Sequence, residues 1–157
     1  MYRDNDILVY ETLVRESKEL FPYHYFLTTV FESWDIVDRL GKDIHEIALT
    51  DSKILARYSK SHLYPLIGVN TDRKRNCHYH NVLLSEKPLN FQALSKFEDG
   101  RRMDIKEYDG RRECLVYTGR KHIPFYQRHI IHPRFNRSEC QSHTCSHSRC
   151  LAPHIPT

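Results

Sequence analysis

Apolar residues follow a helical spacing in two stretches of the chain. Between residues 6 and 20, Ile7, Leu8, Leu13, Val14 and Leu20 are loosely spaced as on one face of a helix, which must end near Pro22. From Asp35 to Ser59 a longer stripe predicts further helix, and Thr50–Asp51 is expected to cap a second helix within it. The longer stripe consists of Ile36, Val37, Leu40, Ile44, Ile47, Ala48, Ile54, Leu55 and Tyr58.

Runs of aromatic and β-branched residues predict strands between the helical stretches. "HYFLTTVFE", residues 24–32, contains no glycine or proline and is typical of a strand. Two further strands, 64–70 and 77–85, flank a polar turn and are expected to pair as a hairpin. The remaining predicted elements are a short helix at 90–98, a strand at 103–109 and a helix at 110–122.

The order of these elements predicts an α+β fold. Strands joined by hairpins pair antiparallel, so we expect a small antiparallel sheet with helices packed on one face. A chain of 157 residues is long enough for one core, which we assign to residues 1–132. Residues 133–157 are expected to form a short Cys/His-rich C-terminal tail.

Composition narrows the class of protein. No segment approaches the roughly 18 consecutive apolar residues of a membrane span, and the N-terminal sequence is too acidic for a signal peptide. We therefore expect a soluble, intracellular, cytoplasmic protein without a membrane partner. The five cysteines are an odd number, and Cys77 and Cys114 stand alone, which indicates reduced thiols rather than a disulfide framework.

Charge is unevenly distributed along the chain. Residues 1–60 contain 8 Lys/Arg and 11 Asp/Glu, a net charge of −3, whereas residues 61–157 contain 16 and 9, a net charge of +7. A basic C-terminal portion with interspersed aromatic residues suits a polyanion such as nucleic acid. The alternative is that these basic residues form an ordinary solvated face.

Two histidines occupy alternate positions of the predicted strand 77–85. Side chains two residues apart project from the same face of a strand, so His78 and His80 would stand side by side and could chelate one divalent cation. The alternative is structural, with one histidine exposed and the other hydrogen-bonded within the fold.

The predicted helix 110–122 carries a tyrosine with charged neighbours. Helical spacing places Glu113, Tyr117 and Lys121 on one stripe. A tyrosine next to a cation and opposite a metal can serve as a nucleophile. The alternative is that Tyr117 is an ordinary core residue of an amphipathic helix.

Three segments together resemble the ordered motifs of the HUH endonucleases, in particular the single-tyrosine replication initiator (Rep) proteins. These segments are "HYFLTTVF", "HYHNVLL" and "DIKEYDGRRECLVYTGRKH", and the resemblance covers residues 23–125. It implies a ferredoxin-like or RRM-like HUH fold, in which His78 and His80 hold Mg²⁺ or Mn²⁺. By the same resemblance, Tyr117 would attack single-stranded DNA and form a 5′-phosphotyrosine intermediate, a nicking and joining activity that initiates rolling-circle replication of a plasmid or virus.

The resemblance also implies partners and DNA contacts. The substrate would be an origin or a hairpin in single-stranded DNA, and a host helicase would supply unwinding, because no helicase segment is visible in the chain. The basic turn Arg73, Lys74 and Arg75 is expected to follow the DNA backbone, with aromatic side chains stacking on bases.

Two features depart from the family pattern. The family lysine follows the tyrosine by three residues, but Arg120 stands there and Lys121 comes next, so either cation is a candidate for assisting Tyr117. A third metal ligand is also expected. Asp72 is preferred because it precedes the histidine strand, and Glu113 and His122 are the alternatives.

The C-terminal tail concentrates possible zinc ligands. Thiolates and imidazoles in such close spacing are typical of a structural zinc site, although the spacing is not that of a standard finger. The alternative is a tail in which these residues are incidental. The candidate ligands are Cys140, His143, Cys145, His147 and Cys150.

Two other functions compete with the Rep interpretation. A single-tyrosine transposase or a relaxase would use the same chemistry. A non-catalytic, zinc-containing nucleic-acid-binding protein would use His78, His80 and Tyr117 only structurally, and would bind DNA without forming a covalent adduct.

Overall fold

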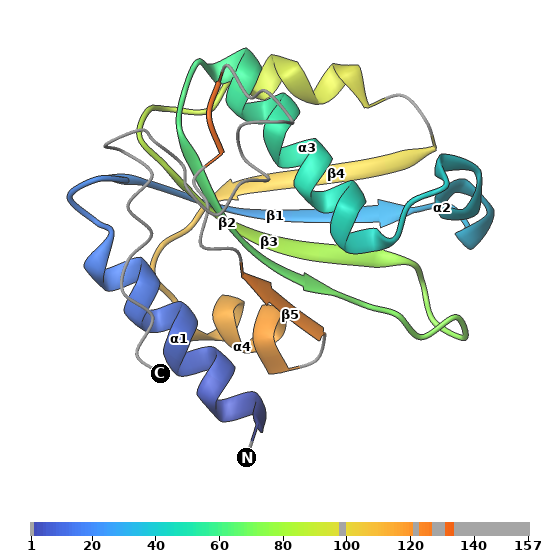
Figure 1. Cartoon of the computed structure of the whole chain (residues 1–157), viewed down its shortest axis with the longest axis horizontal. Coiled ribbons are helices and arrows are strands. Elements are labelled where there is room, and N and C mark those ends of the chain that lie inside the picture. Colours follow the sequence, from blue (N-terminus) through green and yellow to red (C-terminus); the bar gives the residue numbers. More distant parts are fainter. Residues whose placement is uncertain (1, 98–99, 121–122, 127–130, 134–157) are drawn as a thin grey trace, which may run out of the picture.

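The computed structural model describes residues 2–97, 100–120, 123–126 and 131–133 of the chain. Four α-helices, one 3₁₀ helix and five strands lie in these segments (Figure 1). In chain order they are α1 (Tyr2–Glu16), β1 (Tyr23–Phe31), α2 (Trp34–Leu40), α3 (Ile44–Ser59), β2 (Leu63–Val69), β3 (His78–Ser85), the 3₁₀ helix η1 (Phe91–Lys96), β4 (Arg101–Glu107), α4 (Arg112–Arg120) and β5 (Ile123–Tyr126).

The strands form one antiparallel sheet in the order β4-β1-β3-β2-β5. The predicted α+β class and the β2–β3 hairpin are therefore confirmed. Strand β5 was not predicted, because the sequence "IPFY" is short and begins beside a proline. Its backbone pairs with β2, where Ile123 lies opposite Val69.

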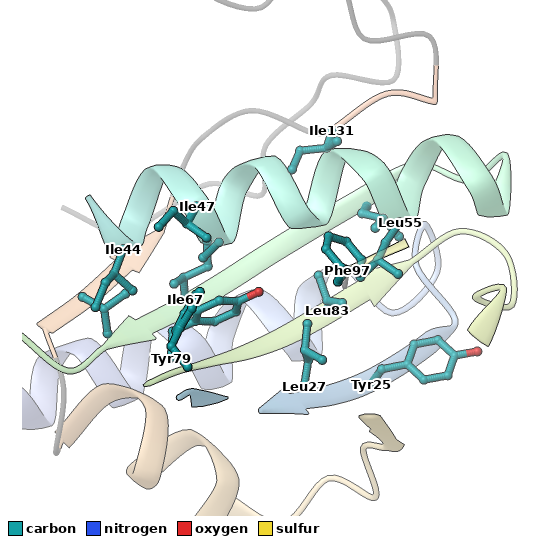
Figure 2. Close-up of a cluster of buried hydrophobic side chains, with 14 of the residues drawn as sticks. Tyr25, Leu27, Ile44, Ile47, Leu55, Ile67, Tyr79, Leu83, Phe97 and Ile131 are labelled. Atoms are coloured by element: carbon teal, nitrogen blue, oxygen red, sulfur yellow. The ribbon is translucent and has the colours of Figure 1, made fainter. Parts of the chain in front are cut away.

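Helix α3 covers one face of the sheet, and the main hydrophobic core lies beneath it (Figure 2). Alternate residues of the strands point toward this helix, among them Leu27 of β1, Ile67 of β2 and Leu83 of β3. Ile47 and Leu55 meet them from α3. Both histidines of β3 have the opposite parity to Leu83 and therefore project from the other face.

Helices α1 and α4 pack against each other on that other face, away from α3 (Figure 1). Tyr10 of α1 and Leu115 of α4 enclose a second apolar cluster with Leu66, Val82 and Leu84 of the sheet. The expectation of helices on one face only is therefore wrong. The physical reason is that β2 and β3 are buried along nearly their whole length, and such strands need cover on both sides.

The helical stretch 35–59 is interrupted earlier than predicted. Helix α2 ends at Leu40 and is capped by Gly41, whose φ of 64° a glycine adopts readily. Asp43 caps the start of α3 by accepting a hydrogen bond from the Glu46 amide at 2.8 Å. The prediction that Thr50–Asp51 caps a helix is therefore wrong. Asp51 lies in the middle of α3 and is buried.

The Asp51 carboxylate binds two side chains of the sheet instead of capping a helix, and these contacts hold α3 against the sheet. It accepts a hydrogen bond from the Tyr79 hydroxyl at 2.5 Å and pairs with the Arg101 guanidinium at 2.5 Å. The Arg101 guanidinium also lies 5.2 Å from the ring centres of Phe31 and Phe97. Burial is the largest cause of the raised pKa of Tyr79, followed by the charge of Asp51. Tyr79 therefore stays a neutral donor.

Two expectations from composition can be compared with the described segments. None of the helices there combines the length and apolar character that crossing a membrane requires. Cys77 and Cys114 are both free thiols, as predicted. Burial raises the pKa of Cys77 to about 11, which keeps this thiol protonated at neutral pH.

Candidate functional site

The histidine pair lies on the face of the sheet that carries α1 and α4. His78 and His80 project from the same side of β3, and their ring centres are 5.2 Å apart. His78 is partly exposed, whereas His80 is only 5% exposed. The Phe26 ring of β1 stacks on His80 with ring centres 5.5 Å apart and an interplanar angle of 12°. His80 is therefore held in one orientation.

Hydrogen bonds at the Nδ1 atoms orient both imidazoles. His78 Nδ1 lies 2.7 Å from the carbonyl oxygen of Asn76, and a carbonyl only accepts, so this nitrogen carries the proton and donates it. His80 Nδ1 lies 3.0 Å from the hydroxyl of Thr28. In a neutral His78 ring, Nε2 therefore holds the lone pair. Outer partners of this kind orient metal-binding histidines in proteins.

Tyr117 of α4 lies against His80. Its ring centre is 5.1 Å from that of His80, and the two rings are nearly perpendicular, at 85°. The side chain is 45% exposed, unlike the fully buried Tyr10, Tyr64 and Tyr79. The interpretation of Tyr117 as a core residue is therefore excluded by the structure. Helix α4 is held instead by Leu115 and Thr118, which are buried.

The candidate third ligands in the described segments do not lie with the histidine pair. No three His, Cys, Asp or Glu side chains gather there in a way that could hold one metal ion. The oxygens of Asp72 accept a hydrogen bond from the Lys74 amide at 3.0 Å and pair with Arg75 at 3.5 Å, which closes the β2–β3 turn. Glu113 is exposed in the first turn of α4.

Several other predicted residues fall outside the described segments. His122, the remaining candidate third ligand, is one of them, and so is Lys121. Arg120 is the last residue of α4, and only its backbone is described. The whole predicted zinc cluster also lies outside, namely Cys140, His143, Cys145, His147 and Cys150.

The basic turn at residues 73–75 is bound to α2, and fewer of its cations are available for DNA than the sequence indicates. Arg73 donates two hydrogen bonds to Asp38, at 2.8 and 3.0 Å, and lies 4.6 Å from the ring centre of Trp34. The Arg73 hydrogen bond holds the pKa of Asp38 below its usual range. Arg75 pairs with Asp72, so Lys74 is the member of the run without an ion pair among described residues.

A part of the same sheet face, over β1 and β4, remains accessible. We call it the open face and define it by Phe26, Thr28, Arg102, Asp104 and Lys106. The β1 residues are partly buried and the β4 residues are exposed. The register places Thr28 between His80 and Asp104 in one row, so the open face continues directly from the histidine pair.

Arg102 is a cation that the sequence did not single out. It pairs with Val30 of β1, which pairs on its other side with His78, so Arg102 and His78 share one row and one face. It makes no ion pair with any described residue, whereas Lys106 lies 3.5 Å from Asp104. The sequence "RRMDIKE" alternates charged and apolar residues. Because Met103 and Ile105 must face the core, this alternation predicts that Arg102 projects from the other face.

The chain matches no family model, no curated protein and no solved structure. The HUH resemblance consequently has no support from comparison with known proteins.

Proposed function

We propose that this protein is a metal-dependent endonuclease that nicks and rejoins single-stranded DNA through Tyr117. The observation that carries the proposal is the contact of a half-exposed tyrosine with a same-face histidine pair, at 5.1 Å between the ring centres of Tyr117 and His80. These residues come from α4 and β3, which are separate in the sequence. The antiparallel sheet with α4 on its histidine face is compatible with the HUH fold that the motifs resemble.

The chemistry would be a reversible phosphoryl transfer. The Tyr117 hydroxyl loses its proton to solvent, and its oxygen attacks the phosphorus of a DNA phosphodiester. The bond from phosphorus to the 3′ oxygen breaks, that oxygen takes up a proton, and the downstream strand keeps its 5′-phosphate on Tyr117. Attack by a 3′-hydroxyl reverses these steps and restores both the DNA backbone and the tyrosine. No energy source is needed, because one phosphoester replaces another.

The histidine pair would hold the cation. Two imidazoles that project from one face of a strand fit the donor chemistry of a divalent transition metal, and Mn²⁺ fits better than Mg²⁺ because Mg²⁺ prefers oxygen ligands. Such a cation, when bound, polarises a phosphodiester oxygen. His122 is the candidate left for a third protein ligand, since Asp72 and Glu113 lie elsewhere.

DNA would reach the site over the open face. Its partly buried Phe26 ring beside His80 offers an apolar surface for a base, and Arg102 and Lys106 offer cations for phosphates. This path replaces the turn at residues 73–75, where two of the three cations already have acidic partners. A single strand suits an exposed sheet face, because its bases are available for stacking.

The experiment that tests this proposal is covalent capture. Single-stranded DNA of mixed sequence, labelled at its 3′ end, is incubated with the protein and Mn²⁺ and then resolved under denaturing conditions. A 5′-phosphotyrosine link leaves the label on the protein, whereas a 5′ label would leave with the released fragment. Tyr117→Phe and His80→Ala should both abolish the adduct.

The matched control is Tyr58→Phe. Tyr58 is 44% exposed, almost the same as Tyr117, but it lies on α3. It should leave the adduct unchanged. Tight DNA binding without any adduct would overturn the nuclease proposal and favour the non-catalytic binding protein. The choice between a Rep protein, a transposase and a relaxase requires the cognate DNA.

A further inference from the structure

Gly68 of β2 lies directly beneath the helix that carries Tyr117. It is paired with His80 in the sheet register, so the two residues are immediate neighbours across β2 and β3. A glycine inside a strand weakens the strand unless something approaches its backbone closely. The approaching group here is the backbone of α4 at Thr118, the residue that follows Tyr117.

The approach is too close for any side chain. A Cβ atom at position 68 would lie 2.0 Å from the Thr118 carbonyl oxygen and 2.8 Å from its carbonyl carbon. Both are backbone atoms, so a rotamer change does not relieve the overlap. Because Cβ atoms essentially never come within 3.0 Å of another heavy atom, α4 would have to retreat by about 1 Å.

The glycine is not there for its backbone conformation. The glycines with positive φ are Gly41, Gly100 and Gly110, and Gly68 is not among them. An alanine could therefore adopt the same backbone angles. What position 68 requires is the absence of a side chain, and the group that requires it is α4.

We propose that Gly68 is a positioning residue that sets the distance between Tyr117 on α4 and His80 on β3. The inference rests on the proposed function, because it assigns a catalytic purpose to that distance. Gly68 neighbours His80 within the sheet, and Thr118 neighbours Tyr117 within the helix. The contact between Gly68 and Thr118 therefore fixes the height of the tyrosine above the histidine.

The test compares Gly68→Ala with the wild-type chain by two independent readouts. The first is the NMR cross-peaks between the ring protons of Tyr117 and His80, which report the spacing whether or not the protein is an enzyme. The second is the single-turnover rate of adduct formation on 3′-labelled DNA with Mn²⁺. We expect weakened cross-peaks and a rate about 100-fold lower, the size of effect that a 1 Å misplacement produces.

If Gly68 had only a structural role, Gly68→Ala would lower the Mn²⁺ and DNA affinities together with the rate. As a positioning residue it should leave both affinities at wild-type values, because the histidine pair and the open face lie on strands that do not move. The control is Leu66→Val, which removes a methylene from the same face of β2 without adding an overlap. It should lower stability but keep both the cross-peaks and the rate per folded molecule.

The outcomes separate the two proposals. Wild-type cross-peaks and a wild-type rate in Gly68→Ala would overturn the inference about Gly68. A wild-type chain that forms no adduct would overturn the proposed function, and the cross-peaks would still decide whether Gly68 sets the spacing. If Gly68→Ala does not fold, Leu115→Phe replaces it, since a larger side chain under α4 should raise the helix. Unchanged cross-peaks and rate there would overturn the inference.

Discussion

The ring of Tyr117 stands almost perpendicular to that of His80, with centres 5.1 Å apart. One ring comes from a helix and the other from a central strand of the sheet. Two neighbouring residues hold the His80 ring in place: the Phe26 ring stacks on it, and the Thr28 hydroxyl is hydrogen-bonded to its Nδ1. Each of these contacts can be altered by a single substitution.

Thr28→Val should weaken metal binding without removing a ligand. The substitution keeps the shape of the side chain but deletes the hydroxyl that bonds His80 Nδ1 at 3.0 Å. Loss of such an outer partner lowers metal affinity by about 10- to 100-fold. The change in affinity is measured by titrating the protein with Mn²⁺ and detecting the free ion by electron paramagnetic resonance.

Thr29→Val is the matched control for this experiment. Thr29 is adjacent in β1, but its side chain points to the opposite face of the sheet. It should not alter Mn²⁺ affinity, and neither should Asp72→Asn or Glu113→Gln. Wild-type affinity in Thr28→Val would contradict the proposed role of the His80 ring.

Arg102→Gln should weaken binding of single-stranded DNA. Arg102 shares a sheet row with His78 and has no acidic partner among the described residues, so its charge is available for a phosphate. Removing one phosphate contact should reduce the slope of log K against log salt by about 0.7. Fluorescence anisotropy at several salt concentrations measures that slope.

Arg57→Gln provides the comparison for the DNA path. Arg57 is exposed on α3, on the other side of the sheet, and its loss should leave the salt slope unchanged. If Arg75→Gln reduced the slope and Arg102→Gln did not, DNA would follow the turn as the sequence alone indicated, and the path over the open face would be wrong.

Arg101→Met should destabilise the fold strongly. The Arg101 and Asp51 side chains are only 5% and 3% exposed, so removing the guanidinium leaves a buried carboxylate without its cation. Such a loss costs about 3–5 kcal/mol of the free energy of unfolding. Urea unfolding measures it, and the exposed pair Arg111–Asp109 is the control, where Arg111→Met should cost at most about 1 kcal/mol. Equal costs for the two variants would contradict this account of the buried pair.

The free energy of unfolding should fall as the pH drops below about 6.5, and His24 should contribute to this fall. Burial lowers the pKa of His24 from its ordinary 6.5, and its Nε2 donates to the Phe21 carbonyl oxygen at 2.7 Å. The unfolded chain therefore binds a proton at a higher pH than the folded chain does. The free energy of unfolding decreases as pH falls through 6.5 and levels off below the folded pKa.

His24→Gln should remove this component of the pH dependence. The experiment compares urea unfolding of both chains at about pH 7.5 and about pH 5.5. The difference between the two pH values should be smaller in the variant. The same difference in both chains would show that His24 does not contribute.

Periodicity predicted most of the elements and placed both histidines on one face of a strand, because the two-residue repeat of a strand is a local property. It did not place α4 on the face opposite α3. Strands β2 and β3 are buried on both faces, so their apolar runs contain no alternation that would assign a helix to one side. The contact of Tyr117 with His80 depends on that placement.

Asp72 and Gly68 illustrate why the surroundings of the site were harder to predict. An aspartate in a turn serves a backbone amide as readily as a metal, and Asp72 accepts the Lys74 amide. A strand glycine signals that something comes close, but the sequence did not identify α4 as the approaching element. The role of Asp72 depends on competition between a metal and a backbone amide within a turn. The role of Gly68 depends on its contact with a helix that is distant in the chain.

The most direct measurement locates the DNA on the protein. Adduct formed with Mn²⁺ is digested with trypsin and nuclease, and the modified peptide is sequenced by mass spectrometry. Cleavage after Arg112 and Arg120 releases a peptide, "ECLVYTGR", in which Tyr117 is the only tyrosine. The account predicts a nucleotide 5′-phosphate on Tyr117. A nucleotide on any other residue, or DNA binding with no Mn²⁺-dependent adduct, would contradict it.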